Sequence, residues 1–298
     1  MHLSVIHETR YRYEEAVLQA HHMAYLRPME EAGQRLHAFD LEIAPAPSAL
    51  AWSTDRYGQQ RCYFELTEPH EELVVTARSR LTTQPLPAAM VGKLPHVQLP
   101  AGMPWEEAAR AMQYVAGQAY DAAREYAQPS ALAPVHDAFA DYARQSELRG
   151  LSAHQVAAEL CHRIYREFRY ESEATDVSTP PLQALKLRAG VCQDFAQVMI
   201  AALRSLGLPA RYVSGYLLTE PPPGQPRLIG VDASHAWVSA YCPQAGWLEF
   251  DPTNNCLAGQ QHVRLAYGRD YGDVAPLRGV IRGGGAHTLK VAVTVMPA

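Results

Sequence analysis

The sequence lacks the features of secreted, membrane-spanning and nucleic-acid-binding proteins. No apolar run follows a basic start, because the segment Met1–Ile6 turns polar at His7 and Glu8, so we expect neither a signal peptide nor a membrane span. The 26 basic and 31 acidic residues give a formal net charge of −5, which argues against a nucleic-acid-binding face. With 298 residues, the chain is long enough for one large or two ordinary domains of a soluble protein.

Cysteines are few, and no two form a close paired motif. Their odd number, five, fits a reducing compartment better than a disulfide framework, so we expect a cytoplasmic protein. Neither Cys161-His162 nor His21-His22 has a partner at a usual metal-site spacing, and we expect no metal and no cofactor. The apolar stripe around Cys161 predicts that Cys161 lies at the core edge of a helix and His162 at its surface.

One cysteine stands at the start of a predicted helix. Apolar residues after Gly190 recur at spacings of three and four, which predicts a buried helix that ends at Gly207. Cys192 would lie in or just before its first turn, where unpaired N–H groups and the positive end of the helix dipole favour a thiolate and could hold an oxyanion. Gly190 removes a side chain ahead of Cys192, and we expect this to let a substrate backbone come close.

His235 and Asp251 are predicted to meet across a hairpin. Alternating residues predict strands at 235–241 and 247–251, joined by a turn at 242–246. A symmetric loop would place Trp237 opposite Asp251 and His235 on the same face, about 7–8 Å away at Cα. Singly, such residues are more often structural, but cysteine, histidine and aspartate in this arrangement are the parts of an activated thiol nucleophile.

Several segments resemble a known family. Those in the second half of the chain are Gly190–Ala196, Pro209–Tyr216, Ser234–Trp237 and Gly246–Asn254. In order and spacing they resemble the bacterial branch of the transglutaminase-like superfamily, while His7–Tyr13, Leu26–Pro28 and Asp55–Gly58 resemble the N-terminal region of its bacterial members. The resemblance implies a papain-like fold with a triad of Cys192, His235 and Asp251. The superfamily includes transglutaminases, peptidases, amidases and members with no known reaction, so the resemblance leaves the substrate open.

The expected fold is α+β, with a papain-like, transglutaminase-like core and an N-terminal β-sandwich-like domain. Residues 1–100 should form the β domain, with strands at 3–13, 39–43, 61–66 and 73–81. Residues 101–275 should form the catalytic domain, in which Pro104 and Ser152 open helices. Residues 276–298 should supply one strand that returns to the N-terminal sheet, and Pro221–Gly224 should be a rigid exposed loop.

The expected reaction is acyl transfer on an amide or peptide bond through a thioester of Cys192, with His235 as base and Asp251 orienting it. Water as acceptor would give a cysteine protease or amidase, which we favour because Glu249 is the one candidate for holding an amine near the triad. An amine acceptor would give a protein-glutamine transglutaminase, and a non-catalytic binding module is the third alternative. We expect a peptide or protein amide as substrate, no nucleic-acid or membrane partner, and leave the oligomeric state open.

Four further residues are supporting or substrate-binding candidates. Tyr170 could present its hydroxyl to the oxyanion or be a buried structural tyrosine. Asp194 could compensate the helix dipole or anchor a neighbouring loop. Tyr216 and Trp237 could line a cleft or pack within the sheet.

Overall fold

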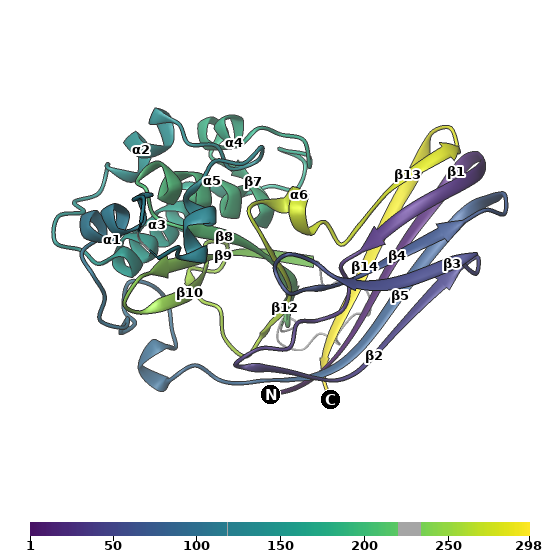
Figure 1. Cartoon of the computed structure of the whole chain (residues 1–298), viewed down its shortest axis with the longest axis horizontal. Coiled ribbons are helices and arrows are strands. Elements are labelled where there is room, and N and C mark those ends of the chain that lie inside the picture. The colour runs from purple at the N-terminus through teal and green to yellow at the C-terminus, as the bar shows by residue number, and fades with distance from the viewer. Residues whose placement is uncertain (118, 220–233) are drawn as a thin grey trace.

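The computed structural model describes residues 1–117, 119–219 and 234–298, which form a β-rich lobe beside a helix-covered lobe (Figure 1). The predicted loop Pro221–Gly224 lies outside these residues. Both chain ends lie in the β-rich lobe, so the helical lobe is built from the middle of the chain. Among the described residues, no helix has the length and apolarity needed to cross a membrane.

The β-rich lobe is one seven-stranded sheet organised by its first strand. Its strands are β1 (His2–Ala24), β2 (Gln34–Ala44), β3 (Ala49–Thr54), β4 (Gln60–Leu66), β5 (His70–Thr83), β13 (Leu277–Gly283) and β14 (His287–Pro297). The first half of β1 pairs with β5 and β14, and its second half pairs with β4 and β13. The register shifts between Arg12 and Val17, and β4 and β5 share one apolar core with the second half of β1.

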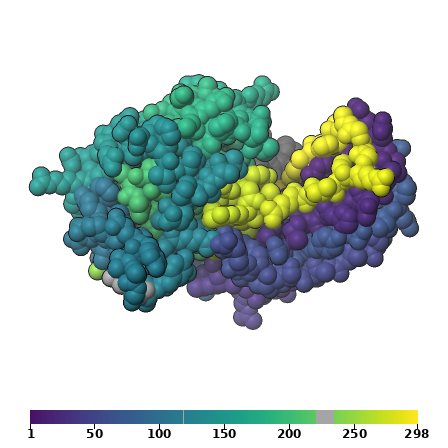
Figure 2. Space-filling model, turned by 45° about the horizontal axis from the view of Figure 1, so that its top comes forward, coloured from purple at the N-terminus to yellow at the C-terminus, as the bar shows by residue number. Residues whose placement is uncertain are grey.

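Two strands of this lobe were not predicted. The end of the chain joins β1 as two strands, β13 and β14, where the sequence predicted one. The side chains of β3 are exposed along its whole length, so it shows none of the buried alternation by which a strand is recognised. Figure 2 shows the C-terminal residues, in yellow, running from the helical lobe onto the purple N-terminal strand.

The helical lobe contains a second sheet, in the order β11-β10-β9-β8-β12. Its strands are β8 (Ala210–Leu217), β9 (Ser234–Cys242), β10 (Gly246–Asp251), β11 (Cys256–Leu257) and β12 (His262–Gly268). Its helices are α1 (Trp105–Ala111), α2 (Asp137–Ala143), α3 (Ala153–Glu167), α4 (Pro181–Leu187), α5 (Cys192–Ser205) and α6 (Tyr271–Val274), with short 3-10 turns at Ala88–Met90 and Ala122–Ala127. Two further strands, β6 (Arg169–Tyr170) and β7 (Ala189–Gly190), pair in parallel beside α5.

The helix starts follow from local sequence. Pro104 immediately precedes α1, and the Ser152 hydroxyl and Gln155 side chain cap the start of α3 reciprocally, as the capping-box spacing predicts. Cys161 lies in the core and His162 is half-buried. Helices α3 and α5 pack on one face of the sheet, so a shared core fixes the start of α5 relative to β9 and β10 (Figure 1).

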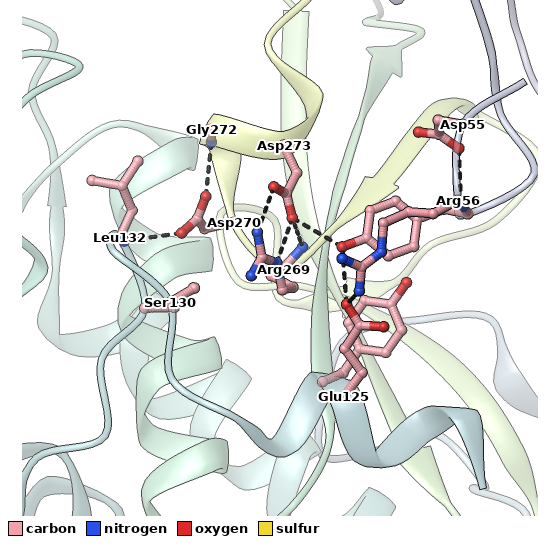
Figure 3. Close-up of polar contacts among 12 residues, drawn as sticks. Asp55, Arg56, Glu125, Ser130, Leu132, Arg269, Asp270, Gly272 and Asp273 are labelled. Atoms are coloured by element: carbon pink, nitrogen blue, oxygen red, sulfur yellow. Dashed lines mark hydrogen bonds and ion pairs between the residues drawn. The ribbon is translucent and has the colours of Figure 1, made fainter. Parts of the chain in front are cut away.

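A polar junction ties the two lobes together (Figure 3). Asp55 accepts hydrogen bonds from the N–H groups of Tyr57 and Gln59, which shapes the turn that follows β3. From this turn Arg56 forms an ion pair with Glu125, and the Tyr57 hydroxyl donates to Asp273 at 3.1 Å. The segment Asp55–Gly58, which carries part of the family resemblance, therefore connects the lobes.

A buried histidine makes the β-rich lobe sensitive to acid. His22 lies against Phe64, and neither of its ring nitrogens has a hydrogen-bond partner among the described residues. Burial, assisted by His70 and His21, lowers the pKa of His22 to about 4. A histidine whose pKa is lower in the folded than in the unfolded chain stabilises the fold at high pH, and that contribution is lost as pH falls from about 6.5 toward 4.

We therefore predict that His22→Leu reduces the loss of unfolding free energy between pH 7 and pH 4.5 by about 2–3 kcal/mol. Urea unfolding of the full chain at the two pH values measures it. His37→Leu, at an exposed position of β2 that does not contribute to the lowered pKa of His22, is the matched control and should keep the wild-type pH dependence. An unchanged pH dependence in His22→Leu would contradict the prediction.

Candidate active site

Cys192 is the first residue of α5, as the apolar spacing predicts. The N–H groups of the first helical turn have no partners within the helix, so they are available to an oxyanion beside the sulfur. Cys192 is half-buried, whereas Cys62, Cys161 and Cys242 are buried. The other half-buried cysteine, Cys256, has its pKa raised to about 12 by burial and the charge of Asp251, which disfavours its thiolate.

The hairpin that carries His235 and Asp251 has the predicted register. Trp247 pairs with Tyr241 and Phe250 pairs with Val238, so the next position places Asp251 opposite Trp237. His235 Nε2 donates to Asp251 Oδ2 at 2.8 Å, which confirms the predicted contact. Because Asp251 occupies Nε2, the ring nitrogen that remains for the hydrogen bond between His235 and Cys192 is Nδ1.

Asp251 is fully buried and surrounded by donors. Its Oδ1 accepts from the N–H groups of Thr253 and Asn254 at 2.9 and 3.1 Å. Its Oδ2 accepts from His235, from the Asn254 side chain at 2.7 Å and from His262 at 3.0 Å. Burial alone would raise the pKa of Asp251, but the charge and hydrogen bond of His235, together with the hydrogen bond of His262, hold this pKa far below its usual range. The residue therefore stays an anion and orients His235.

The charge of Asp251 also controls His235. Burial lowers the pKa of His235, but the negative charge and hydrogen bond of Asp251, together with the contact to Cys192, outweigh it and raise this pKa to about 10. The imidazole is therefore cationic at neutral pH. An imidazolium beside a cysteine is the partner that a thiolate needs.

Gly190 makes room for the Asp194 carboxylate. The prediction that it makes room for an approaching substrate is therefore corrected. It is buried with a φ of +150°, and a Cβ there would overlap the Asp194 carboxylate. Asp194 Oδ2 accepts from the Val191 N–H at 2.8 Å and from the Thr175 hydroxyl at 2.6 Å. Two roles were considered for Asp194. The hydrogen bond from Thr175 shows that Asp194 anchors a neighbouring loop, and the position of Asp194 in the first turn of α5 also places its negative charge at the positive end of the helix dipole.

Tyr170 lies beside the nucleophile and is exposed over 57% of its surface. Its backbone pairs with Gly190 in the ladder of β6 and β7, and its ring meets Phe195 edge-on. Partial burial, followed by the charges of Cys192 and Asp194, raises the pKa of Tyr170. The alternative of a buried structural tyrosine is therefore wrong, and an oxyanion role stays a prediction.

Two other candidates belong to the core and line no cleft. Trp237 is 0% exposed and donates through Nε1 to Glu249 at 2.8 Å, and Tyr216 is 1% exposed with its hydroxyl 3.0 Å from His7 Nδ1. Glu249 also accepts from Arg264 and from the Tyr267 hydroxyl. Glu249 is thus a buried structural anion, which corrects its candidacy as the site for a substrate amine.

Comparisons with known proteins agree with this arrangement. Residues 3–82 match the bacterial transglutaminase-like N-terminal region, and residues 138–252 match the transglutaminase-like superfamily. An uncharacterised protein of Mycobacterium tuberculosis is 41% identical over 298 residues, covering 98% of this chain and 92% of that protein. The chain belongs to the transglutaminase-like superfamily.

Two further proteins resemble this chain, one in its fold and one in part of its sequence. A crystal structure of a candidate cysteine protease from Cytophaga hutchinsonii superposes with a TM-score of 0.73 at 19% identity, covering 99% of this chain and 90% of its own, which shows a shared fold. A protein-glutamine gamma-glutamyltransferase of Pseudomonas aeruginosa is 34% identical over 128 residues, 40% of this chain and 19% of that protein. The predicted papain-like, transglutaminase-like core is confirmed, and the predicted N-terminal β-sandwich-like domain is a β-rich region whose strands form one seven-stranded sheet.

The sequence did not predict two residues of this candidate active site, Asn254 and His262. Asn254 follows the aspartate in a segment that carries the family resemblance, so its position was a usable signal. His262 opens β12, and nothing in its local sequence points to Asp251, eleven residues earlier. The contact forms in the folded chain although β9 and β8 separate β10 from β12 in the sheet order.

The side chains of His235, Asp251 and His262 lie close enough to be tested as a metal site, with their ligand atoms within 4.8 Å of one another. The Gly259 N–H donates to His262 Nδ1 at 3.2 Å, so Nδ1 carries no proton and Nε2 does. A histidine that binds a metal through Nε2 instead keeps its proton on Nδ1. The donor set therefore fits a hydrogen-bonded relay and does not fit a metal.

Proposed function

We propose that this protein is a cysteine-nucleophile hydrolase that cleaves an amide or peptide bond through a thioester on Cys192. The observation that carries the proposal is the position of His235, between a fully buried carboxylate and a half-buried thiol at a helix start. This arrangement supplies a thiolate, a proton donor for the leaving amine and unpaired N–H groups for the oxyanion. Membership of the transglutaminase-like superfamily supports the same class of chemistry.

The proposed reaction proceeds in two halves. The Cys192 thiolate attacks the amide carbonyl carbon, and the oxyanion forms near the N–H groups at the start of α5 and the Tyr170 hydroxyl. The C–N bond then breaks as His235 Nδ1 gives its proton to the departing amine, which leaves a thioester. Neutral His235 next takes a proton from water, the hydroxide displaces the thiolate, and the acid product leaves.

Water is favoured as acceptor because an amine competes only where the enzyme holds it and excludes solvent. Three carboxylates at or near the triad, Asp194, Asp251 and Glu249, all have partners inside the protein. The Cytophaga neighbour supports a protease, whereas the Pseudomonas relative supports the transglutaminase alternative. A binding module is disfavoured because reactive residue types fill all three triad positions. A peptide or protein substrate and a cytoplasmic location stay predictions.

The first test of this proposal separates the nucleophile from the orienting residue. Cys192→Ala should abolish both acid release from a panel of peptide and glutamine amides and any covalent acyl adduct seen by intact-mass spectrometry. Asp251→Asn should leave a folded protein with His235 in the wrong tautomer and about 10⁴-fold less activity, the loss known for this change in serine triads. Cys256→Ala is the matched control and should keep activity. Full activity in Cys192→Ala would refute the assignment.

The second test concerns the acceptor. With an amide that the wild-type protein turns over, we expect acid product to predominate as a primary amine is raised to millimolar concentration, because Asp194, Asp251 and Glu249 already have partners inside the protein. Chromatography gives the ratio of acid to amine adduct. Predominant adduct would favour the transglutaminase alternative and retain the thioester.

A further inference from the structure

Strand β12 is an edge strand whose open side is covered by the β-rich lobe, which is called the N-terminal lobe below. The Gln34 side chain donates to the Arg264 carbonyl and accepts from the Arg264 N–H, both at 2.8 Å. The Met29 N–H also donates to the Arg264 carbonyl, at 3.1 Å. A side-chain amide thus takes the place of a neighbouring strand, which satisfies backbone groups that an open edge would leave unpaired.

Two more contacts from this lobe hold the same segment. The Gln59 side chain accepts from the Tyr267 N–H and is itself held by Asp55 at 2.8 Å, beside the junction in Figure 3. The Thr83 hydroxyl donates to the Gln260 carbonyl at 2.6 Å. The N-terminal lobe therefore forms hydrogen bonds with the chain on both sides of His262.

The His262 ring lies between this hydrogen-bonded segment, residues 260–267, and the triad. Its Nδ1 accepts from Gly259 and its Nε2 donates to Asp251 Oδ2 at 3.0 Å. The ring meets Trp237 edge-on with centroids 5.1 Å apart, and it is 3% exposed. An imidazole whose two ring nitrogens are both occupied in this way can hold the carboxylate of Asp251 in place.

We propose that His262 is a positioning residue of the triad. The N-terminal lobe holds β12 in place, and β12 in turn sets, through His262, the orientation of Asp251 toward His235. The inference rests on the proposed function, because it requires an active triad. Its physical basis is that Asp251 Oδ1 is held by a turn, whereas Oδ2 depends on side chains from β9, from the turn after β10 and from β12. The N-terminal lobe holds the β12 segment through Gln34, Gln59 and Thr83. A displaced β12 would rotate the carboxylate out of line with the imidazole.

The test measures alkylation of Cys192 by iodoacetamide in the full chain, followed by peptide mass spectrometry from pH 6 to 9. The ionisable side chains around the Cys192 and His235 pair are Asp251, His262, Asp194, Tyr170, Tyr212 and, behind Asp251, Cys161 and Cys256. Wild-type Cys192 should react at a rate that changes little over this range, because His235, with its pKa raised to about 10, stays cationic beside the sulfur.

His262→Leu should lower the rate at pH 7 by about 10- to 100-fold, the scale seen when hydrogen-bonded partners of site histidines are removed in metal enzymes. The remaining rate should rise with pH like that of an ordinary thiol with a pKa of about 8.5. His262→Gln keeps an N–H for Asp251 and a carbonyl for Gly259, so it should restore most of the rate and the flat profile. This rescue separates positioning from a packing role.

His154→Leu is the matched control, because His154 is a fully buried histidine that contacts the Gly246 carbonyl and no triad member. It should lower the thermal stability and leave the rate and its pH profile unchanged. For the lobe contact, Gln34→Leu should change the profile in the same direction as His262→Leu but by less. The exposed Gln60→Leu in the same lobe should have no effect.

Each outcome bears on a different claim. Wild-type protein in which Cys192 reacts no faster than Cys256 would overturn the proposed function and this inference with it. A reactive wild type with unchanged His262→Leu would overturn the inference alone. Loss in both His262→Leu and His262→Gln, with the same flat profile, would also overturn it by indicating packing. An unchanged Gln34→Leu would overturn the part played by the N-terminal lobe.

Discussion

The buried carboxylate of Asp251 is the constraint on which the site depends. An anion without solvent contact is tolerated only when donors satisfy both oxygens, and here they come from β9, from the turn after β10 and from the start of β12. A one-residue slip of the hairpin would turn His235 to the other face of the sheet and leave the charge without its main partner. Sheet register and site geometry are therefore one requirement.

The parts of this arrangement that local sequence determines could be predicted. The apolar spacing after Gly190 located the start of α5, the loop at 242–246 gave the hairpin register, and Ser152 with Gln155 marked the start of α3. In each, the interacting residues lie within one element or one turn, so residue spacing converts directly into geometry. The same locality explains why residue spacing alone was enough to pair His235 with Asp251.

The remaining parts depend on contacts between residues far apart in the chain. Gln34 meets Arg264 only after both sheets have formed, and Glu249 meets Tyr267 only after the five-stranded sheet has formed. Strand alternation does not distinguish a buried ion-pair partner from an exposed one. The sequence did not reveal that Gly190 makes room for the Asp194 carboxylate, because that contact depends on how the chain enters α5. Its lack of a side chain was therefore attributed to an approaching substrate. His262 was missed for the same reason, since its partner Asp251 lies in β10, a strand that does not pair with β12.

The central claim is that Asp251 keeps His235 cationic beside Cys192. The most direct measurement is a pH titration of protein with ¹⁵N-labelled histidine, following the two ring nitrogens of His235 by NMR between pH 5 and pH 10. With a pKa near 10, both nitrogens should carry protons at pH 7 and above. A neutral His235 at pH 7, with one ring nitrogen unprotonated, would contradict the account.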